Sequence, residues 1–207
     1  MAFIKKQTVQ PVTADERKRS RDCESLVADL ENANPMVRRW AARDLTDCPA
    51  PSAALVSRLQ QEEDASVRAV ILTTLTSMGD EVAVAGLVGC LRSEDAALRN
   101  EAIEAMKQLP DEVAPIMRGL LADANPDVRI FAVNILESLR HPDVECWLIA
   151  VIDRDPELNV CATAVDLLVE VGSAAALAPL QHLKARYADE PYIQFAADLA
   201  LKRITEG

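Results

Sequence analysis

Few side chains in this sequence have the types and spacing that catalysis or metal binding requires. The chain has only two histidines, His141 and His182, and neither has a carboxylate partner at the spacing that metal sites use. Glycine-rich loops that hold phosphates are absent, and so is the glycine-flanked serine of a nucleophile elbow. We therefore predict no catalytic residue, no metal ligand and no cofactor, and we expect that the protein is not an enzyme.

The cysteines also offer no recognisable chemistry. No two of them are spaced as Cys-x-x-Cys, and several stand among apolar residues, where a free cysteine behaves as a small buried hydrophobe. We expect structural thiols and a reducing, cytoplasmic location. The five residues are Cys23, Cys48, Cys90, Cys146 and Cys161. The N-terminus lacks the apolar core of a secretory signal, which agrees with that location.

Composition predicts an all-α protein that binds neither nucleic acid nor membranes. Half of the 207 residues are apolar, yet only 3% are aromatic and only 6 are glycine, so a β-sandwich or a hairpin-rich fold is disfavoured. The formal net charge of −11 opposes binding to phosphate backbones and to anionic lipid. No run of apolar residues is long enough for a transmembrane helix.

One short pattern recurs six times along the chain. A capping Asn, Asp or Glu, often followed by Pro, precedes an aliphatic residue by three positions, and in four cases Arg follows directly. A side chain at the N-cap accepts a hydrogen bond from the first helical turn, which stabilises by ~1 kcal/mol. The steps between successive aliphatic residues are 30, 31, 30, 30 and 35; the residues are Val37, Val67, Leu98, Val128, Leu158 and Ile193.

Each pattern opens a helix. Four and eight residues after the aliphatic residue come further core positions, which places all three on one helix face. The fifth unit is the exception, because Asp166 stands at its last core position. A second amphipathic segment precedes each of these helices, at roughly 16–31, 51–62, 80–92, 111–122, 142–153 and 173–187. The sequence thus predicts six stacked helix pairs.

The unit D/N-x-x-V/L-R-x-x-A, as in the segment from Val37 to Ala41, resembles the HEAT-repeat family, specifically its short bacterial type named for phycobilisome lyases. The resemblance covers about residues 20–204 and implies a right-handed α–α superhelix. We expect one solenoid domain over 16–207 after a flexible tail, 1–15. It further implies a non-enzymatic protein-binding scaffold. The alternative is a subunit of a bilin-lyase-type enzyme or a chromophore-binding chaperone.

The recurrent charged residues have a structural explanation. We expect the repeated aspartates to be N-caps, namely Asp64, Asp95 and Asp155. The resemblance implies that the repeated arginines pair with capping acids of adjacent units; these are Arg38, Arg68, Arg99 and Arg129. Asn159 and Gln194 stand where the family has Arg, so we expect this ladder to fade toward the C-terminus.

The candidate partner site lies on the outward face of the second helices, which line the concave side of a HEAT array. In the last three units this face is apolar, which predicts an interface with another protein or a homodimer contact. The candidate residues are Ile130, Phe131, Val160, Leu167, Phe195 and Leu199. The other interpretation is that a shifted register buries them. A secondary candidate lies in the first unit at Arg39, Trp40 and Arg43.

The N-terminal segment differs in charge from the rest of the chain. Residues 1–22 carry a net charge of +3 on an otherwise acidic protein. Two interpretations fit this contrast. The segment is either a solvated leader that docks loosely on the acidic body, or a linear docking element for a partner that uses Phe3 and Ile4.

Overall fold

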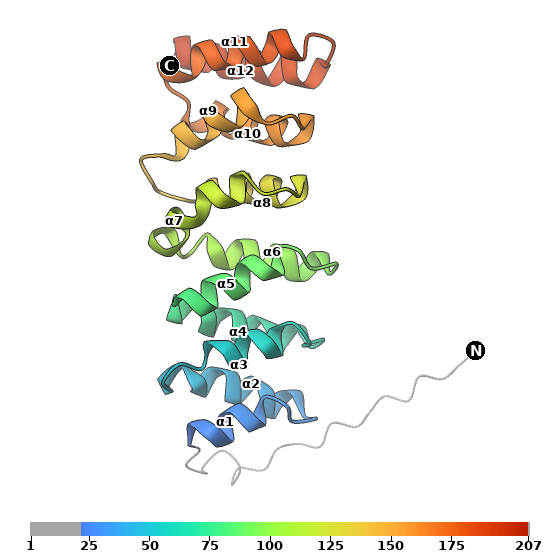
Figure 1. The fold of residues 1–207 in the computed structure, drawn as a ribbon, viewed down its shortest axis with the longest axis vertical. Coiled ribbons are helices and arrows are strands. Elements are labelled where there is room, and N and C mark those ends of the chain that lie inside the picture. Colours follow the sequence, from blue (N-terminus) through green and yellow to red (C-terminus); the bar gives the residue numbers. More distant parts are fainter. Residues whose placement is uncertain (1–21, 207) are drawn as a thin grey trace, which may run out of the picture. The chain divides into compact units, whose positions relative to one another are not determined.

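The structure is a computed structural model that describes residues 22–206, and in this range it contains twelve α-helices and no strand (Figure 1). The helices follow one another as six pairs, so the predicted all-α class and the repeat arrangement are confirmed. The predicted tail, 1–15, lies outside the described residues. Two compact units divide the chain between Cys90 and Leu91, and each is described by itself. The extent of the solenoid domain remains a prediction.

The first unit contains two helix pairs and the first helix of the third. Helix α2 packs against α4, and α3 packs against both α4 and α5. The approach of α5 to α3 requires a glycine, because a Cβ added to Gly86 would lie 2.3 Å from a methyl group of Val56. The elements are α1 (Cys23–Asp29), α2 (Pro35–Asp44), a 3-10 turn (Leu45–Asp47), α3 (Ser52–Leu59), α4 (Ala65–Met78) and α5 (Glu81–Cys90).

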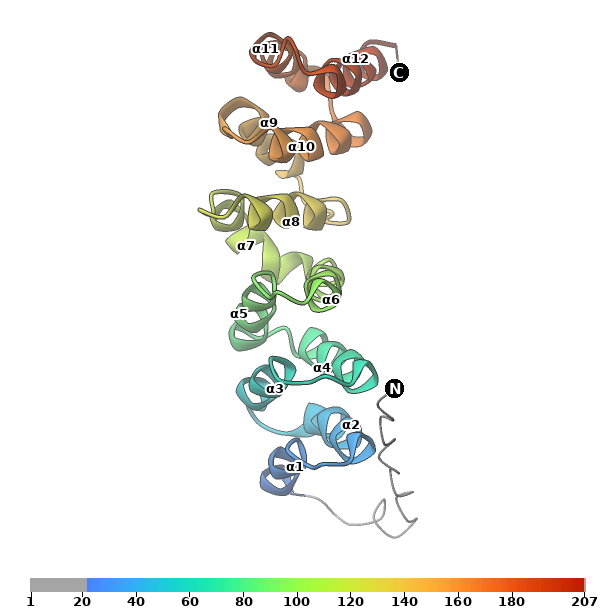
Figure 2. The same ribbon diagram turned by 90° about the vertical axis from the view of Figure 1, so that its right-hand side faces the viewer.

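The second unit forms two layers of helices. The second helix of each pair contacts the second helix of the next pair: α6 contacts α8, α8 contacts α10, and α10 contacts α12. We call these four helices the second-helix layer. The first helices of the pairs, α7, α9 and α11, lie together on one side of this layer (Figure 2). The elements are α6 (Ala96–Met106), α7 (Pro110–Leu121), α8 (Pro126–Leu136), α9 (Val144–Arg154), α10 (Leu158–Val171), a 3-10 turn (Ala174–Ala176), α11 (Leu177–Arg186) and α12 (Pro191–Glu206).

The predicted N-caps are confirmed at four second helices and wrong at a fifth. Asp64 and Asp95 each accept hydrogen bonds from two backbone amides of the first turn, and Asn34 and Asn125 each accept one. Asp155 does not cap α10, which begins two residues later than predicted, with Glu157 at its N-cap.

This two-residue difference corrects the register of the fifth repeat, which consists of α9 and α10. The buried row of α10 consists of Val160, Ala164 and Leu168, three residues whose side chains are fully inaccessible. Asp166, the exception in the predicted core row, is exposed. The fifth repeat therefore follows the same core pattern as the other repeats, but its core row begins two residues later, at Val160.

The expectation that all five cysteines are free thiols is wrong for two of them. Cys23 and Cys48 form a disulfide that joins the start of α1 to the residue after the first 3-10 turn. Cys90 and Cys161 are free and buried, whereas Cys146 is free and exposed. Burial raises the pKa of the Cys90 thiol to about 11, which keeps it protonated and unreactive.

Candidate partner-binding surface

Helix α12 carries an exposed apolar stripe. Tyr192, Phe195 and Leu199 are separated by three and four residues, so they lie on one face of the helix. Their exposed fractions are 54%, 67% and 45%. The opposite face of α12 is buried through small residues such as Ala196 and Ala200, which allow close packing on α10 and α11. Helix α12 is therefore apolar on both faces, and only one of them is covered.

Two of the stripe residues were predicted, and the third was missed. The prediction placed Phe195 and Leu199 on the outward face, and both are exposed. Tyr192 lies one turn earlier on the same face, so the helical period extended backward would have found it. Its hydroxyl donates to the carboxylate of Asp166 on α10, with oxygen distances of 2.7 and 2.8 Å. This bond holds the tyrosine ring at the edge of the stripe that faces α10 and raises the pKa of Tyr192.

The other predicted contact residues on α8 and α10 are less accessible. Ile130, Phe131 and Leu167 are half-buried. The guanidinium carbon of Arg99 lies 5.7 Å from the centre of the Phe131 ring, so one face of that ring is already occupied by a cation. These three residues therefore expose less apolar surface than Phe195 does.

The prediction that Val160 faces a partner is wrong. Its side chain is fully buried in the core. The prediction counted outward positions from Leu158, whereas the corrected register counts them from Val160 itself. The outward positions of α10 are then occupied by Ala162 and Asp166, which are smaller or charged. The apolar surface is consequently concentrated on α12 rather than spread over three helices.

The secondary candidate belongs to the first unit. Arg39 and Arg43 are exposed and Trp40 is half-buried, all on α2. The guanidinium of Arg43 donates to the carboxylate of Asp44 at 2.7 and 2.8 Å, so its charge is largely neutralised by its neighbour. Of the two arginines on this face, Arg43 is therefore compensated by Asp44, and Arg39 is exposed.

Two of the four repeated arginines, Arg38 and Arg129, pair with an acid of the next repeat. In the first unit Arg38 donates to both carboxylate oxygens of Glu62 at 2.7 Å, and Arg58 donates to the same group at 3.0 Å. Burial alone would raise the pKa of Glu62, but these bonds, together with that from the amide of Asp64, hold it below its usual value. The acid lies two residues before the N-cap, rather than at the cap as the resemblance implied.

The same link recurs in the second compact unit, but the fifth repeat lacks the arginine that would continue it. Arg129 pairs with Asp155, which occupies the position equivalent to Glu62. In the corrected register Cys161 follows Val160 at the position where the first four repeats have Arg. The last turn of α9 is instead bonded from the next repeat, because Arg186 donates to the carbonyl oxygens of Ile152 and Asp153 at 2.8 and 3.1 Å. Arg38 and Arg129 are thus structural, and Arg99 donates to the carbonyl oxygen of Ser93 in the loop before its own helix.

Neither a metal centre nor a membrane-spanning segment is found within residues 22–206. No group of three or more potential ligands lies close enough to hold a metal ion in that range. His141 accepts a hydrogen bond from the amide of Asp143 and stacks on Trp147, with ring centres 4.9 Å apart. None of the described helices combines the length and the apolar character needed to cross a bilayer. His141 accordingly has a structural place in the turn before α9.

Comparison with known families agrees with this architecture. A model of HEAT repeats matches residues 23–107, 52–123 and 113–202, which together cover nearly all the described chain. The chain therefore belongs to the HEAT-repeat family.

Individual relatives are distant. An uncharacterized phycocyanin operon protein, protein Z of Pseudanabaena tenuis, is 25% identical over 198 residues, which cover 87% of this chain and 94% of that protein. Among solved structures, Cex1p is 15% identical with a TM-score of 0.52 and matches over 89% of this chain and 43% of its own. The complex of CpcE and CpcF of phycocyanin lyase from Nostoc is 18% identical with a TM-score of 0.40, over 95% of this chain and 100% of that chain. The likeness to Cex1p agrees with the helical fold and shows nothing beyond it.

Proposed function

We propose that this chain is a non-enzymatic scaffold that binds another protein through the apolar stripe of α12. The observation that carries the proposal is the exposure of Tyr192, Phe195 and Leu199 on one helix face. Burying a side chain of this size stabilises a contact by about 1.5–3 kcal/mol. Aromatic residues also supply a large share of interface energy in known complexes. HEAT repeats, as stacked helix pairs, offer a rigid surface for such a contact.

The spacing of the stripe indicates the kind of partner. Residues three and four apart on a straight helix match the apolar row of a second helix packed along it. An amphipathic helix of the partner is therefore the occupant that we propose. Two exposed charges flank the stripe: Asp166, which accepts the Tyr192 hydroxyl, lies at one edge, and Lys202, which lies 3.9 Å from Glu206, is near the C-terminal end. Their opposite signs favour one direction of that helix.

The test is affinity capture from a native lysate of the source organism with wild-type protein and with the Phe195→Asp/Leu199→Asp variant. The matched control is Arg39→Ala in the first unit. We expect a protein that is retained by the wild type and by the control and lost with the double variant, while far-UV circular dichroism stays unchanged. Capture that is equal in all three would refute the proposal.

A second copy of the chain is the other occupant that this experiment must separate. Sedimentation velocity of the wild type at several concentrations measures self-association. A dimer that the double variant abolishes would assign the stripe to a homodimer contact in place of a foreign partner. If the wild type sediments as a monomer at all concentrations, the stripe is not a homodimer contact, and binding of another protein is the interpretation that stands.

The proposal retains a cytoplasmic location, although one observation counts against it. The Cys23–Cys48 disulfide is of a kind that reducing compartments rarely maintain. Trapping thiols by alkylation directly in cells, followed by mass spectrometry of these two residues, tests the location. Full alkylation agrees with the cytoplasm, and a protected pair indicates an oxidising compartment.

A second candidate function is supported by the name of one relative. The 25% identity to a phycocyanin operon protein suggests a bilin-lyase-type subunit or a chromophore-binding chaperone. Mixing the pure protein with a free bilin tests this candidate. A shift in the bilin absorbance spectrum would favour it, and no shift would leave the scaffold as the better proposal.

A further inference from the structure

A cavity lies between α7 and α9 in the second unit, and Arg129 of α8 lines one end of it. Its volume is about 660 Å³, within the range of about 300–1,000 Å³ that small-molecule sites have. Helix α9 packs closely on α11, whereas α7 and α9 make few close backbone contacts. The space that helix packing would otherwise fill is therefore open.

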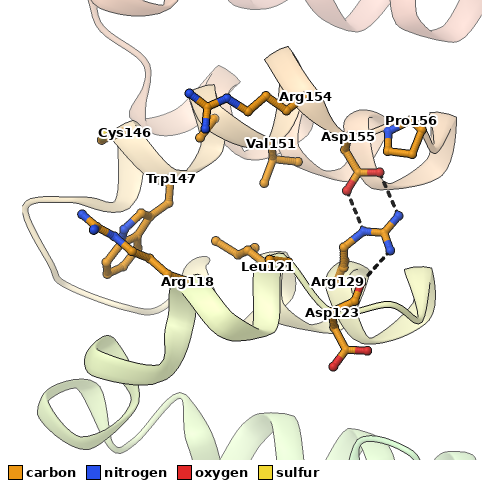
Figure 3. Close-up of a pocket in the computed structure, with 12 residues that line it drawn as sticks. Arg118, Leu121, Asp123, Arg129, Cys146, Trp147, Val151, Arg154, Asp155 and Pro156 are labelled. Atoms are coloured by element: carbon orange, nitrogen blue, oxygen red, sulfur yellow. Dashed lines mark hydrogen bonds and ion pairs between the residues drawn. The ribbon is translucent and has the colours of Figure 1, made fainter.

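The middle of the cavity is apolar and one end is closed. Leu121 of α7 and Val151 of α9 point toward each other across it (Figure 3). The buried pair of Arg129 and Asp155 forms the wall at one end, where two hydrogen bonds of 2.7 and 2.9 Å satisfy both charges. Both charges at this end are paired with each other, so neither is available to bind a ligand.

The other end of the cavity carries positive charge that the protein does not neutralise. Arg118 from α7 and Arg154 from α9 both line the cavity, and their guanidinium groups lie toward Trp147 (Figure 3). Within residues 22–206 neither arginine has a hydrogen bond or an ion pair. The acids of the lining are already engaged, since Asp123 is paired with Arg92 and Asp155 with Arg129. Two cations thus remain unpaired on a chain whose net charge is −11.

Trp147 adds an independent observation. Its side chain lines the cavity and is only 6% exposed, yet its indole N–H has no acceptor among the described residues. Buried indole N–H groups usually have an acceptor, because an unsatisfied donor is costly. His141 stacks on the ring with an interplanar angle of 11° and limits the positions that the ring can adopt. A carboxylate entering between the ring and Arg118 would provide that acceptor.

We propose that this cavity binds a small amphipathic carboxylate, with its apolar body between Leu121 and Val151 and its carboxylate at Arg118, Arg154 and Trp147. Guanidinium groups bind carboxylates through charge-assisted hydrogen bonds, and the aliphatic walls bury the apolar part. The site goes beyond the proposed function, because its lining includes no residue of α12. No bond is made or broken in this binding.

Two reporters in the cavity make the test direct. The Trp40→Phe variant leaves Trp147 as the single tryptophan of the two in the chain. Cys146, the exposed free cysteine, lines the same cavity, whereas the other free thiols are buried. We expect decanoate to change the Trp147 fluorescence saturably and to protect Cys146 from iodoacetamide. Decyltrimethylammonium, with the same chain and the opposite charge, and acetate, without the chain, should do neither.

Variants then locate the site. Arg118→Gln/Arg154→Gln should weaken decanoate binding by about tenfold or more through loss of the charged donors. The control Arg140→Gln/Arg203→Gln changes the net charge equally but lies outside the cavity, and Phe195→Asp changes the α12 stripe; both should bind decanoate as the wild type does. Equal binding of the two decyl compounds, or binding that the cavity variant leaves unchanged, would overturn the proposal.

Discussion

Arg129 and Asp155 form a buried, two-point ion pair that joins the fourth repeat to the fifth. The Nε and Nη2 atoms of Arg129 donate to the two carboxylate oxygens at 2.7 and 2.9 Å, and the two residues are only 8% and 7% exposed. A third bond, from Nη1 to the carbonyl oxygen of Asp123, ties the same guanidinium to the loop before its own helix. One side chain therefore holds three segments of the second unit in place.

We predict that Asp155→Asn destabilises the protein by about 3 kcal/mol, because it leaves a buried guanidinium without its counter-charge. Urea unfolding followed by far-UV circular dichroism measures the change. Asp127→Asn, at an exposed position in the first turn of α8, is the control and should cost no more than about 0.5 kcal/mol. Equal losses in the two variants would show that the ion pair contributes no more than a surface charge.

The N-cap of α6 provides a local prediction. The Asp95 carboxylate accepts hydrogen bonds from the amides of Ala97 and Leu98 at 2.8 and 3.3 Å. Asp95→Ala should lower the free energy of unfolding by about 1 kcal/mol. Partner capture through α12 should be retained, because the cap does not touch the stripe. Loss of capture at unchanged stability would instead make Asp95 a functional carboxylate.

Glu62 predicts how stability depends on pH. Its folded pKa lies below the ordinary value of 4.5, so its contribution is complete above pH 4.5 and is lost as the pH falls through the folded pKa. Glu62→Gln leaves Arg38 and Arg58 without their shared anion and should cost about 2 kcal/mol at pH 7. The stability difference between wild type and variant should shrink below pH 4.5. A difference that stays constant down to pH 3 would contradict the role of this charge.

The Cys23–Cys48 disulfide closes a loop with a sequence separation of 25 residues. Reducing it should destabilise the first unit by roughly 3 kcal/mol, through the extra freedom of the unfolded chain. Thermal unfolding with and without dithiothreitol measures the effect. The Cys23→Ser/Cys48→Ser variant should start at the lower stability and should not respond to the reductant. If the wild type is equally stable in both conditions, the disulfide does not form or does not stabilise.

The helix pairs could be predicted because each unit repeats its own local signals, a cap followed by a core row of period 3.6. The prediction of the register failed in the fifth repeat. Asp155-Pro156 matches the cap pattern by residue type, although Asp155 serves as the partner of Arg129. The sequence did contain a correcting signal, because counting from Val160 places Leu168 at the last core position, where counting from Leu158 places Asp166. Core composition could have decided between the two registers.

The disulfide and the cavity had no comparable local signal. Cysteines pair only where the backbone brings them together, and the Cα atoms of Cys23 and Cys48 lie 5.7 Å apart because α1 and α2 fold back on each other. The cavity depends on the separation between α7 and α9, which is set by the packing of whole helices. Arg118 and Arg154 read as ordinary surface residues until that separation is known.

The contrast between Val160 and Phe195 gives the sharpest test of the corrected register. Val160 is fully buried, whereas Phe195 is 67% exposed on the neighbouring helix. Val160→Asp should destabilise by about 4 kcal/mol or more, because it places a charge in an apolar core. Phe195→Asp should change stability by no more than about 1 kcal/mol and should act on partner binding instead. Urea unfolding of both variants measures the difference. Comparable stability of the two would mean that Val160 faces outward after all, and the partner surface would then extend across α10.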